Sequence, residues 1–334
     1  MPLGEFDVIR RFFRTPALEA AGDEGRVTLG IGDDAALLSP DPEKQWVIST
    51  DSLIQGVHFP DQYLPADIAY RALAVAVSDL AAMGARPIAF TLALTLPTVD
   101  EDWLEEFAAG LTEAARDHRI SLIGGDTTRG PLNIGVSVFG EVNGFKVVRR
   151  RDAQPGDLLC VGGSLGDAGA GLALAQGQGQ AVPATLDEQS QAYLLQRFWR
   201  PLAQCELGLE LAGVASAGLD ISDGLLADAG HLARASQVAL HINSAQLPCS
   251  AALMHWPAAQ RREWMLGAGD DYRLLFTLPV ASERCLSVWA TQGFEVSVIG
   301  EVVAGEGVWL DDGDGPKVVT DVGGYQHFKD ASND

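Results

Sequence analysis

Six short acidic motifs, each set among Gly, Ser or Thr, carry the side chains of this sequence that could do chemistry. They are Gly-Ile-Gly-Asp-Asp (30–34), Ser-Thr-Asp (49–51), Ser-Asp (78–79), Gly-Gly-Asp-Thr-Thr (124–128), Asp-Ile-Ser-Asp-Gly (220–224) and Gly-Ala-Gly-Asp-Asp-Tyr (267–272). Most follow an apolar segment that we expect to be a strand. Carboxylates are hard oxygen ligands, and small neighbours leave room for a ligand beside them. The pattern predicts a site for Mg²⁺ and the phosphates of a nucleotide.

Asp79 is the most informative single carboxylate. The segment Ala72–Met83 is apolar apart from Ser78 and Asp79, which predicts a helix buried on all sides. A carboxylate in such a helix must find a partner or stay protonated at a cost. No basic residue lies within one helical turn of Asp79, because Arg71 is two turns back. We therefore expect a metal to meet Asp79, with an arginine from elsewhere in the chain as the alternative.

Asp33, Asp34 and Asp126 each allow a functional and a plain interpretation. Two adjacent carboxylates about 5 Å apart repel by roughly 3 kcal/mol at an effective dielectric near 20, and a divalent ion would reverse that penalty. Alternatively, Asp33 and Asp34 form an exposed turn. Gly124 and Gly125 would let backbone N–H groups approach a ligand next to Asp126. The alternative there is an Asx-turn that closes the loop.

The second half of the chain offers a further candidate phosphate site. Asp220 and Asp223 bracket Ser222, and the helix expected after Gly224 would attract anions at its N-terminus. Alternatively, Asp223 is only the helix N-cap. The glycine-rich turn 162–166 resembles a dinucleotide-binding fingerprint but lacks glycine at position 161, so we interpret it as a strand-to-helix turn. The run Arg149–Arg151 is either a solvated surface or the source of one phosphate-binding arginine.

Composition restricts the class of protein. A chain of 334 residues suggests about two domains of ~150 residues. The net charge of −22 argues against a nucleic-acid partner, although divalent cations could still bridge the chain to an acidic nucleotide. The longest apolar run is far below the ~20 residues that span a bilayer, and the N-terminus has no apolar signal core. Four widely spaced cysteines without Cys-x-x-Cys favour the cytoplasm, and no P-loop motif is present.

Strand-like and helix-like segments alternate along the chain, which predicts an α/β or α+β fold. The expected strands are 27–31, 46–50, 89–96, 121–123, 133–142, 158–161, 217–221, 273–278, 295–302 and 308–319, the last with a turn at 311–315. The expected helices are 67–83, 100–118, a helix ending near 175, 186–199, 203–212 and 225–235. The segment Asn143–Gly156 is the best candidate for a domain junction, so we expect domains at 1–147 and 148–334.

The order of the motifs resembles the thiamine-monophosphate kinase family. The matching segments include Ser-Thr-Asp-Ser-Leu-Ile-Gln-Gly-Val-His-Phe (49–59), Leu-Ile-Gly-Gly-Asp-Thr-Thr-Arg-Gly (122–130) and Leu-Asp-Ile-Ser-Asp-Gly-Leu (219–225). The similarity runs from Gly4 to about Phe328. The family belongs to the ATP-binding superfamily of aminoimidazole ribonucleotide (AIR) synthetase and selenophosphate synthetase. The resemblance implies a cytoplasmic homodimer whose N-terminal domains form a β-barrel, with a C-terminal α/β domain covering the ATP cleft.

The resemblance also implies the reaction and its residues. ATP would phosphorylate thiamine monophosphate directly, with several Mg²⁺ ions, to give thiamine diphosphate. Because the nucleophile is a phosphate oxygen that is already ionised, no general base is required, and we expect no catalytic residues beyond those that position metals and phosphates. The implied magnesium ligands are Asp33, Asp34, Ser49, Thr50, Asp51, Asp79, Asp126, Asp220 and Asp223; the implied ATP contacts are Gly125, Asp126, Arg150 and Ser222; the implied substrate contacts are His58, Asp270 and Tyr325.

Residues 268–273 read Ala-Gly-Asp-Asp-Tyr-Arg where the family pattern is usually Gly-Gly-Glu-Asp-Tyr-Glu, and two of the departures involve charged side chains. The chain has Asp270 where the first Glu is usual, which shortens a substrate contact by one methylene. It has Arg273 where the last Glu is usual, which reverses a charge at an expected strand start. The thiazolium ring of thiamine is cationic, so an acid such as Asp270 and an aromatic ring such as Tyr325 are reasonable neighbours for it.

Three other classes remain as alternatives. A sister kinase or synthetase of the superfamily is the nearest, although selenophosphate synthetase would need a reactive cysteine in an N-terminal loop and the first cysteine here is Cys160. A multi-metal phosphohydrolase would usually recruit several histidines, and the six in this chain form no cluster in sequence. A non-enzymatic magnesium- or calcium-binding protein would not explain acidic motifs spread over so much of the chain.

Overall fold

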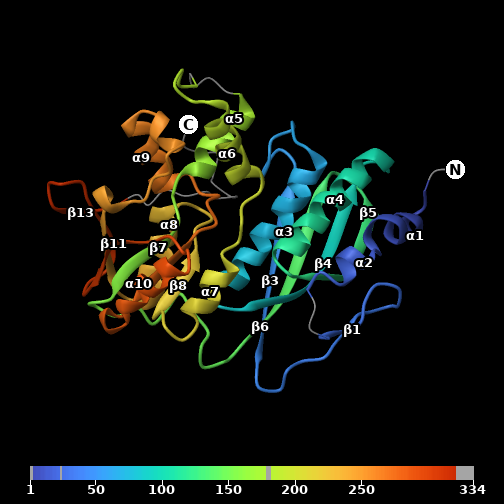
Figure 1. The fold of residues 1–334 in the computed structure, drawn as a ribbon, viewed down its shortest axis with the longest axis horizontal. Helices are drawn as coiled ribbons and strands as arrows, with labels where there is room; N and C mark the ends of the chain where they lie inside the picture. Colours follow the sequence, from blue (N-terminus) through green and yellow to red (C-terminus); the bar gives the residue numbers. More distant parts are fainter. Residues whose placement is uncertain (1–2, 23–24, 178–181, 321–334) are drawn as a thin grey trace. The chain divides into compact units, whose positions relative to one another are not determined.

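The computed structural model describes residues 3–22, 25–177 and 182–320. The chain divides into two compact units, each a mixture of helices and strands. Unit 1 comprises residues 1–148, 175–177 and 199–214, and unit 2 comprises 149–174, 178–198 and 215–334 (Figure 1). Among the described residues, no helix combines the length and apolar character that crossing a membrane requires.

Unit 1 is built on a four-stranded sheet with the strand order β3-β6-β4-β5. Strands β4 and β5 are parallel, and the other two pairs are antiparallel. The elements of this unit are α1 (Glu5–Val8), the π-helix η1 (Ile9–Phe13), α2 (Pro16–Glu19), β1 (Val27–Leu29), β2 (Leu37–Leu38), β3 (Gln45–Ile54), α3 (Pro65–Ala82), β4 (Arg86–Leu96), α4 (Glu101–Asp117), β5 (Ser121–Arg129), β6 (Asn133–Val142) and α7 (Cys205–Leu211).

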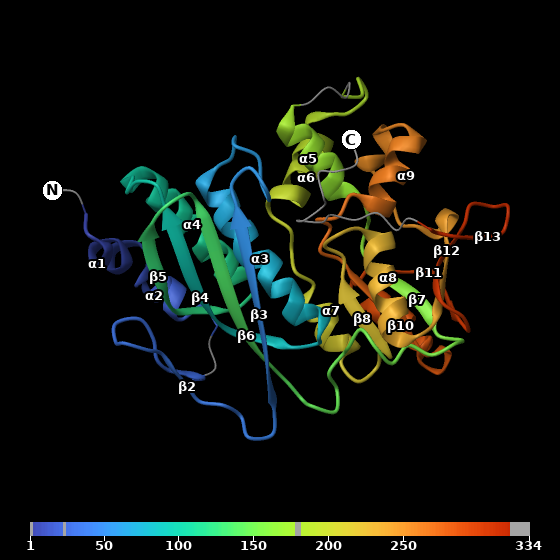
Figure 2. The ribbon, with the colours of Figure 1, turned by 180° about the vertical axis from the view of Figure 1, so that it is seen from behind.

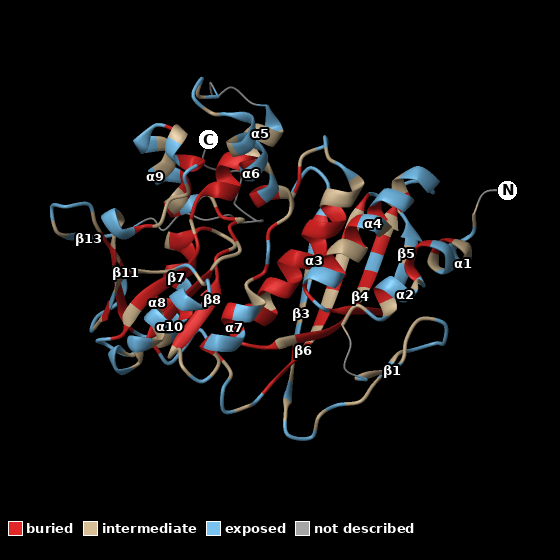
Figure 3. Cartoon of the chain, viewed as in Figure 1, coloured by how far each residue is buried: buried red, intermediate tan, exposed pale blue. Residues whose placement is uncertain are grey.

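Helix α3 lies against one face of this sheet and packs beside α4. Its side chains are buried almost without interruption, as its apolar sequence predicts (Figure 3). Val47 and Leu53 of β3 and Val136 of β6 alternate with exposed or half-buried neighbours and fill the interior beneath the helix. The helix therefore fixes one face of the sheet as the core of unit 1.

The opposite face of strand β3 is open. Ile48, Thr50, Ser52 and Ile54 are all exposed there, and among the described residues no helix crosses β3 on this side (Figure 2). Strands β3 and β5 form the two edges of the sheet. Two exposed isoleucines next to an unpaired strand edge are typical of a surface that pairs with another chain.

Unit 2 is built on a seven-stranded sheet with the order β13-β12-β9-β11-β7-β10-β8, in which only β9 and β12 pair in parallel. Leu219, Leu240, Leu275 and Ile299 belong to its buried core. The elements are β7 (Leu158–Gly162), α5 (Asp167–Gln176), α6 (Glu188–Trp199), β8 (Ala217–Asp220), α8 (Leu225–Ser236), β9 (Ala239–Asn243), the 3₁₀ helices η2 (Ser244–Gln246), η3 (Leu253–His255) and η4 (Val280–Ser282), α9 (Ala258–Gly267), β10 (Leu274–Leu278), α10 (Arg284–Thr291), β11 (Val296–Val303), β12 (Gly307–Asp311) and β13 (Pro316–Val318).

Most of the expected elements are confirmed within a few residues, and three expectations about where strands end are wrong. The strand expected at 27–31 ends at Leu29. Two motifs expected to follow strands lie inside them, because β3 continues to Ile54 and β5 to Arg129. The N-terminal helices, β9, α9 and α10 were not among the expected elements. The turn after β7 leads into α5, as expected for a strand-to-helix turn.

Candidate functional site

A cavity of about 700 Å³ in unit 1 brings together two of the acidic motifs. Asp33 and Asp34 line it from the loop after β1, and Gly125 and Asp126 line it from β5. Both adjacent aspartates are exposed, and the backbone N–H of Asp34 donates to Asp33 Oδ1 at 2.9 Å. The cavity can therefore offer three carboxylates to a cation.

Arg14 also lines this cavity, and the sequence analysis did not single it out. Gly32 has a φ of +127°, and a Cβ atom there would lie 2.9 Å from the guanidinium carbon of Arg14. Glycine therefore lets the guanidinium group lie directly over the loop that carries Asp33. Among the described residues Arg14 has no ion pair, so its charge is available to an anion. Arg14 can be recognised as a candidate only from its position next to Gly32 in the fold, because no local sequence pattern places the two residues together.

Gly125 occupies a position where β4 and β5 approach closely. A Cβ atom on Gly125 would lie 1.9 Å from the carbonyl oxygen of Leu92, and the residue has a φ of +154°. Glycine is thus required by the strand pairing, and it places Asp126 at the cavity wall. The side chain of Asp126 is exposed.

A second acidic group of unit 1 lies on the face of the sheet that α3 covers. The hydroxyl of Ser49 donates a hydrogen bond to Asp79 Oδ2, so neither a metal nor an arginine is needed to explain that oxygen. Asp51 is different, because its Oδ2 is buried and has no hydrogen-bond partner among the described residues. Burial, and then the nearby charge of Asp79, raise the pKa of Asp51 to about 6. Within the described part of the chain, no basic side chain forms an ion pair with Asp51 or Asp79.

The two acidic groups of unit 1 are separate within one chain. One row of paired residues crosses the sheet from Asp51 to β5. Asp51 of β3 pairs with Val136 of β6, Val136 pairs with Leu92 of β4, and Leu92 pairs with Gly125 of β5. Three strand spacings put Asp51 about 14 Å from β5. Thr50 points to the opposite face from Asp51, and its hydroxyl is 2.8 Å from that of Ser137. The structure therefore unites Ser49, Asp51 and Asp79, and separately Asp33, Asp34 and Asp126.

His58 follows β3 and is held by the end of that strand. The backbone N–H of Ile54 donates to its Nδ1 at 3.0 Å. A neutral ring then carries its proton on Nε2, which makes that atom a hydrogen-bond donor. His58 could donate to a substrate oxygen from this position.

In unit 2, the loop after β8 and the loop before β10 pack backbone against backbone. The N–H of Asp270 donates to the carbonyl of Ser222, and the N–H of Tyr272 donates to that of Ile221, both at 2.9 Å. A Cβ atom on Gly269 would lie 2.5 Å from the Ser222 carbonyl oxygen, so only glycine permits this approach. Asp270 and Tyr272 have φ values of +60° and +47°, which is strained for tyrosine. The arrangement brings Asp270 beside Ser222.

Asp228 of α8 organises the loop that carries Asp223, and the sequence analysis missed it. Its Oδ2 accepts hydrogen bonds from the N–H groups of Ser222 and Asp223, both at 3.0 Å. Burial raises the pKa of Asp228 to about 7, and the charges of Asp223 and Asp220 act in the same direction. Asp220 is itself buried. Three carboxylates therefore converge at the N-terminus of α8, the kind of arrangement a divalent cation stabilises.

Arg150 and His231 lie near this group. The backbone carbonyl of Arg150 accepts a hydrogen bond from the Ser236 hydroxyl at 2.9 Å, which ties the arginine run to the end of α8. Burial, and then the charges of Arg234 and Arg150, lower the pKa of His231. The exposed guanidinium of Arg150 could meet a phosphate here.

The remaining positions of the substrate motif have structural roles or lie outside the described residues. Asp271 is buried, and its carboxylate accepts hydrogen bonds from the N–H groups of Gly166 and Ala168 at the start of α5. Arg273 directly precedes β10, as expected, and its guanidinium lies over Gly163. Tyr325 lies outside the described residues.

The fold and its acidic groups define a class of ATP-binding protein. Residues 32–142 match the family model for the N-terminal domain of AIR synthase related proteins, and residues 154–312 match the C-terminal domain model. The thiamine-monophosphate kinases of Salmonella typhimurium and Escherichia coli K12 are each 43% identical to the chain over 98% of its length and 99% of theirs. The chain therefore belongs to the thiamine-monophosphate kinase family.

Solved structures agree with this assignment. The thiamine-monophosphate kinase of Stenotrophomonas maltophilia K279a has a TM-score of 0.83 and 43% identity, covering 93% of this chain and 98% of its own. The structure of AaThiL complexed with AMPPCP and TMP has a TM-score of 0.75 and 33% identity, covering 98% of this chain and 99% of its own.

Proposed function

We propose that the protein transfers the γ-phosphoryl group of ATP to thiamine monophosphate, giving ADP and thiamine diphosphate. The observation that carries the proposal is family membership over the whole chain, together with the match to a structure that holds AMPPCP, an analogue of ATP, and TMP. The carboxylate groups of both units fit the proposal, because transfer between two phosphates requires many negative charges to be neutralised.

The acidic groups fit Mg²⁺. Hard oxygen ligands are present in both units. In unit 1, Asp51 has a buried oxygen without a hydrogen-bond partner among the described residues, and in unit 2 the carboxylates of Asp220, Asp223 and Asp228 lie together. Asp33, Asp34, Ser49, Thr50, Asp51, Asp79 and Asp126 would hold the ions in unit 1, and Asp220 and Asp223 would hold them in unit 2. Bound Mg²⁺ would neutralise and align the phosphates for in-line transfer.

The chain's own residues position the reactants. Arg14 and Arg150 would each bind a phosphate, Arg14 from the wall of the unit 1 cavity and Arg150 from beside α8. Backbone N–H groups near Gly125 and Ser222 would approach the nucleotide. His58 would donate from Nε2 to the substrate. Asp270 and Tyr325 would face the cationic thiazolium ring, and the attacking phosphate oxygen needs no base.

We further propose a homodimer in which the open sheet faces of two copies close into a barrel. The exposed Ile48 and Ile54 and the unpaired edges of β3 and β5 support this arrangement. In such a barrel β3 of one copy lies next to β5 of the other, which brings Asp51 towards Asp126 of the second copy. The dimer would thus unite carboxylates that one chain keeps apart. The free cysteines suit a cytoplasmic enzyme.

A phosphorus NMR time course of the purified protein with ATP, Mg²⁺ and thiamine monophosphate tests the function. Signals of ADP and thiamine diphosphate should grow together, and EDTA should abolish both. Asp79→Asn should slow the reaction by about 100-fold or more, whereas Glu105→Gln, an exposed acid on α4, should not. Inorganic phosphate in place of thiamine diphosphate would indicate a phosphohydrolase instead.

A further inference from the structure

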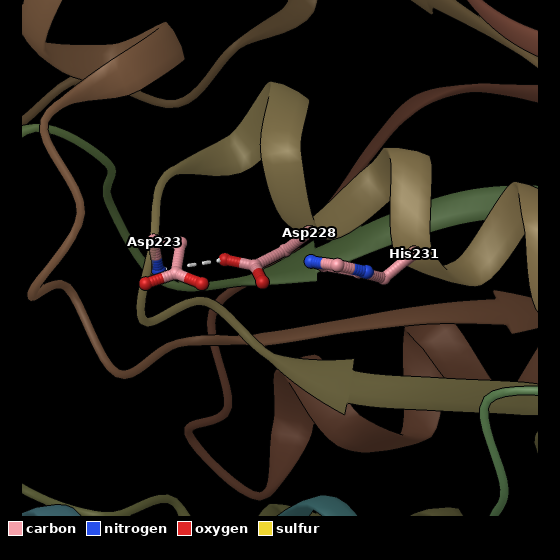
Figure 4. A group of neighbouring side chains, drawn as sticks. All are labelled: Asp223, Asp228 and His231. Atoms are coloured by element: carbon pink, nitrogen blue, oxygen red, sulfur yellow. Dashed lines mark hydrogen bonds between the residues drawn. The ribbon is translucent and has the colours of Figure 1, made fainter. Parts of the chain in front are cut away.

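Asp223, Asp228 and His231 form a cluster of metal-ligating side chains at the start of α8. One ligand atom from each lies within 4.8 Å of the others. Figure 4 shows the Asp228 carboxylate between the other two, with a ring nitrogen of His231 facing it. The family resemblance points only to Asp223 in this cluster, as a magnesium ligand, and it includes neither Asp228 nor His231.

The backbone conformation holds these three side chains close together without a bound ion. Asp228 and His231 are three residues apart on α8 and therefore project from the same face of the helix. The loop that carries Asp223 is fastened over that face by the two hydrogen bonds from Ser222 and Asp223 to Asp228 Oδ2. A Cβ atom on Gly224 would lie 2.9 Å from the backbone of Gly267, so the loop cannot easily relax outward. The three side chains are therefore preorganised.

Asp228 and His231 also keep ligand atoms that no hydrogen bond occupies among the described residues. The two backbone hydrogen bonds use Oδ2 of Asp228, and among the described residues Oδ1 accepts none. Within the described part of the chain neither ring nitrogen of His231 has a hydrogen-bond partner, and the side chain is exposed. Small rotations of Asp223 and His231 would bring all three ligand atoms to the ~2.0–2.2 Å that a bound ion requires.

The imidazole nitrogen of His231 determines which divalent cations the cluster prefers. Mg²⁺ prefers oxygen ligands and keeps much of its water, whereas imidazole nitrogen suits later divalent metals, with affinity rising along the first transition row. We propose that Asp223, Asp228 and His231 form a divalent-cation site that binds Co²⁺ or Zn²⁺ more tightly than Mg²⁺. The proposal builds on the proposed function, since Asp223 is among its magnesium ligands, but binding of the metal alone can be measured without turnover.

Titration of the metal-free full-length protein with Co²⁺, without nucleotide or substrate, tests the site. Wild-type protein should develop the visible absorption of Co²⁺ bound to nitrogen and oxygen, and Zn²⁺ should displace it. His231→Gln should weaken Co²⁺ binding by about tenfold or more and change the spectrum, while Mg²⁺ affinity should change by less than about twofold. His255→Gln, which removes a histidine of unit 2 outside the cluster, is the matched control and should bind as wild type.

Asp228→Asn provides an independent variant. Its amide oxygen can still accept the two backbone hydrogen bonds, but its nitrogen cannot bind a metal, so a folded variant should lose Co²⁺ binding. Wild-type affinity and spectrum in His231→Gln, or no Co²⁺ binding by the wild-type protein, would overturn the proposal. If one of these two results were found but the NMR assay still showed kinase activity, only the cation site would be rejected and the proposed function would stand. If Co²⁺ bound as expected but the assay showed no kinase activity, the proposed function would be rejected and the cation site would stand.

Discussion

At the scale of single residues, Asp51 is held in its ionised form at a cost in the metal-free protein. Its pKa of about 6 lies above the ~3.8 expected in the unfolded chain, because burial and Asp79 disfavour its charge. The folded state therefore binds more protons between these values, and the contribution of Asp51 to stability is lost as pH rises through that window.

Because folding raises the pKa of Asp51, the stability of the protein should depend on pH in a measurable way. In EDTA, Asp51→Asn should be more stable than wild type, and the difference in the free energy of unfolding should grow by about 1 kcal/mol between pH 5 and pH 7.5. Urea unfolding of both proteins at the two pH values measures it. Adding Mg²⁺ at pH 7.5 should stabilise wild type and reduce the difference. A constant difference would show that folding does not raise the pKa of Asp51.

Arg14 provides a test of the unit 1 cavity as a nucleotide site. Arg14→Gln should raise the KM for ATP about tenfold, because one charge-assisted hydrogen bond to a phosphate is lost. The KM for thiamine monophosphate should change by less than about twofold. Arg116→Gln, an exposed arginine of α4, should change neither value. Equal increases in both KM values would place Arg14 away from the nucleotide.

At the scale of elements, Gly124 and Gly125 form a matched pair inside β5. Gly125→Ala should lower the free energy of unfolding by about 2 kcal/mol or more, since its Cβ would overlap the Leu92 carbonyl of β4. Gly124→Ala should cost less than about 1 kcal/mol, because its nearest neighbour would be the Thr91 methyl group at 3.9 Å. Chemical denaturation of both variants measures the difference. Equal losses would mean that β4 and β5 do not approach as closely as described.

Elements with strong local patterns could be predicted from the sequence. The long, mostly apolar segment of α3 and the alternation in β6 each specify one structure, and both are confirmed. Helices α9 and α10 were not assigned, because α9 is rich in polar residues and α10 carries a narrow apolar stripe. The extension of β3 and β5 through their acidic motifs is set by pairing with β6 and β4, which no local pattern reveals.

The residues that position the site were harder to predict than its carboxylates. Asp223 belongs to a short motif next to glycine and serine, whereas Asp228 acts on that motif from inside a helix. Arg14 reaches the Asp33 loop only because Gly32 leaves space for it. Such roles depend on tertiary proximity, so sequence spacing alone could not have shown them.

At the scale of the whole molecule, the proposed dimer would bring together Asp51 and Asp126, which lie on the two edge strands β3 and β5 of the unit 1 sheet in one chain. If β3 of one copy lies beside β5 of the other, each site takes Asp51 from one chain and Asp126 from its partner. Asp51→Asn and Asp126→Asn homodimers should then both be nearly inactive. A heterodimer of the two variants would contain one site with both substitutions and one site with neither.

Co-expression of the two variants with different affinity tags tests this arrangement. Random mixing should restore about one quarter of the wild-type activity, and the heterodimer purified through both tags should reach about one half. A site built within one chain predicts no recovery, because every site in the mixture would then lack one carboxylate. Co-expressed Asp51→Asn and Asp79→Asn are the control: these residues lie together in one chain, so a heterodimer of the two should leave both sites defective.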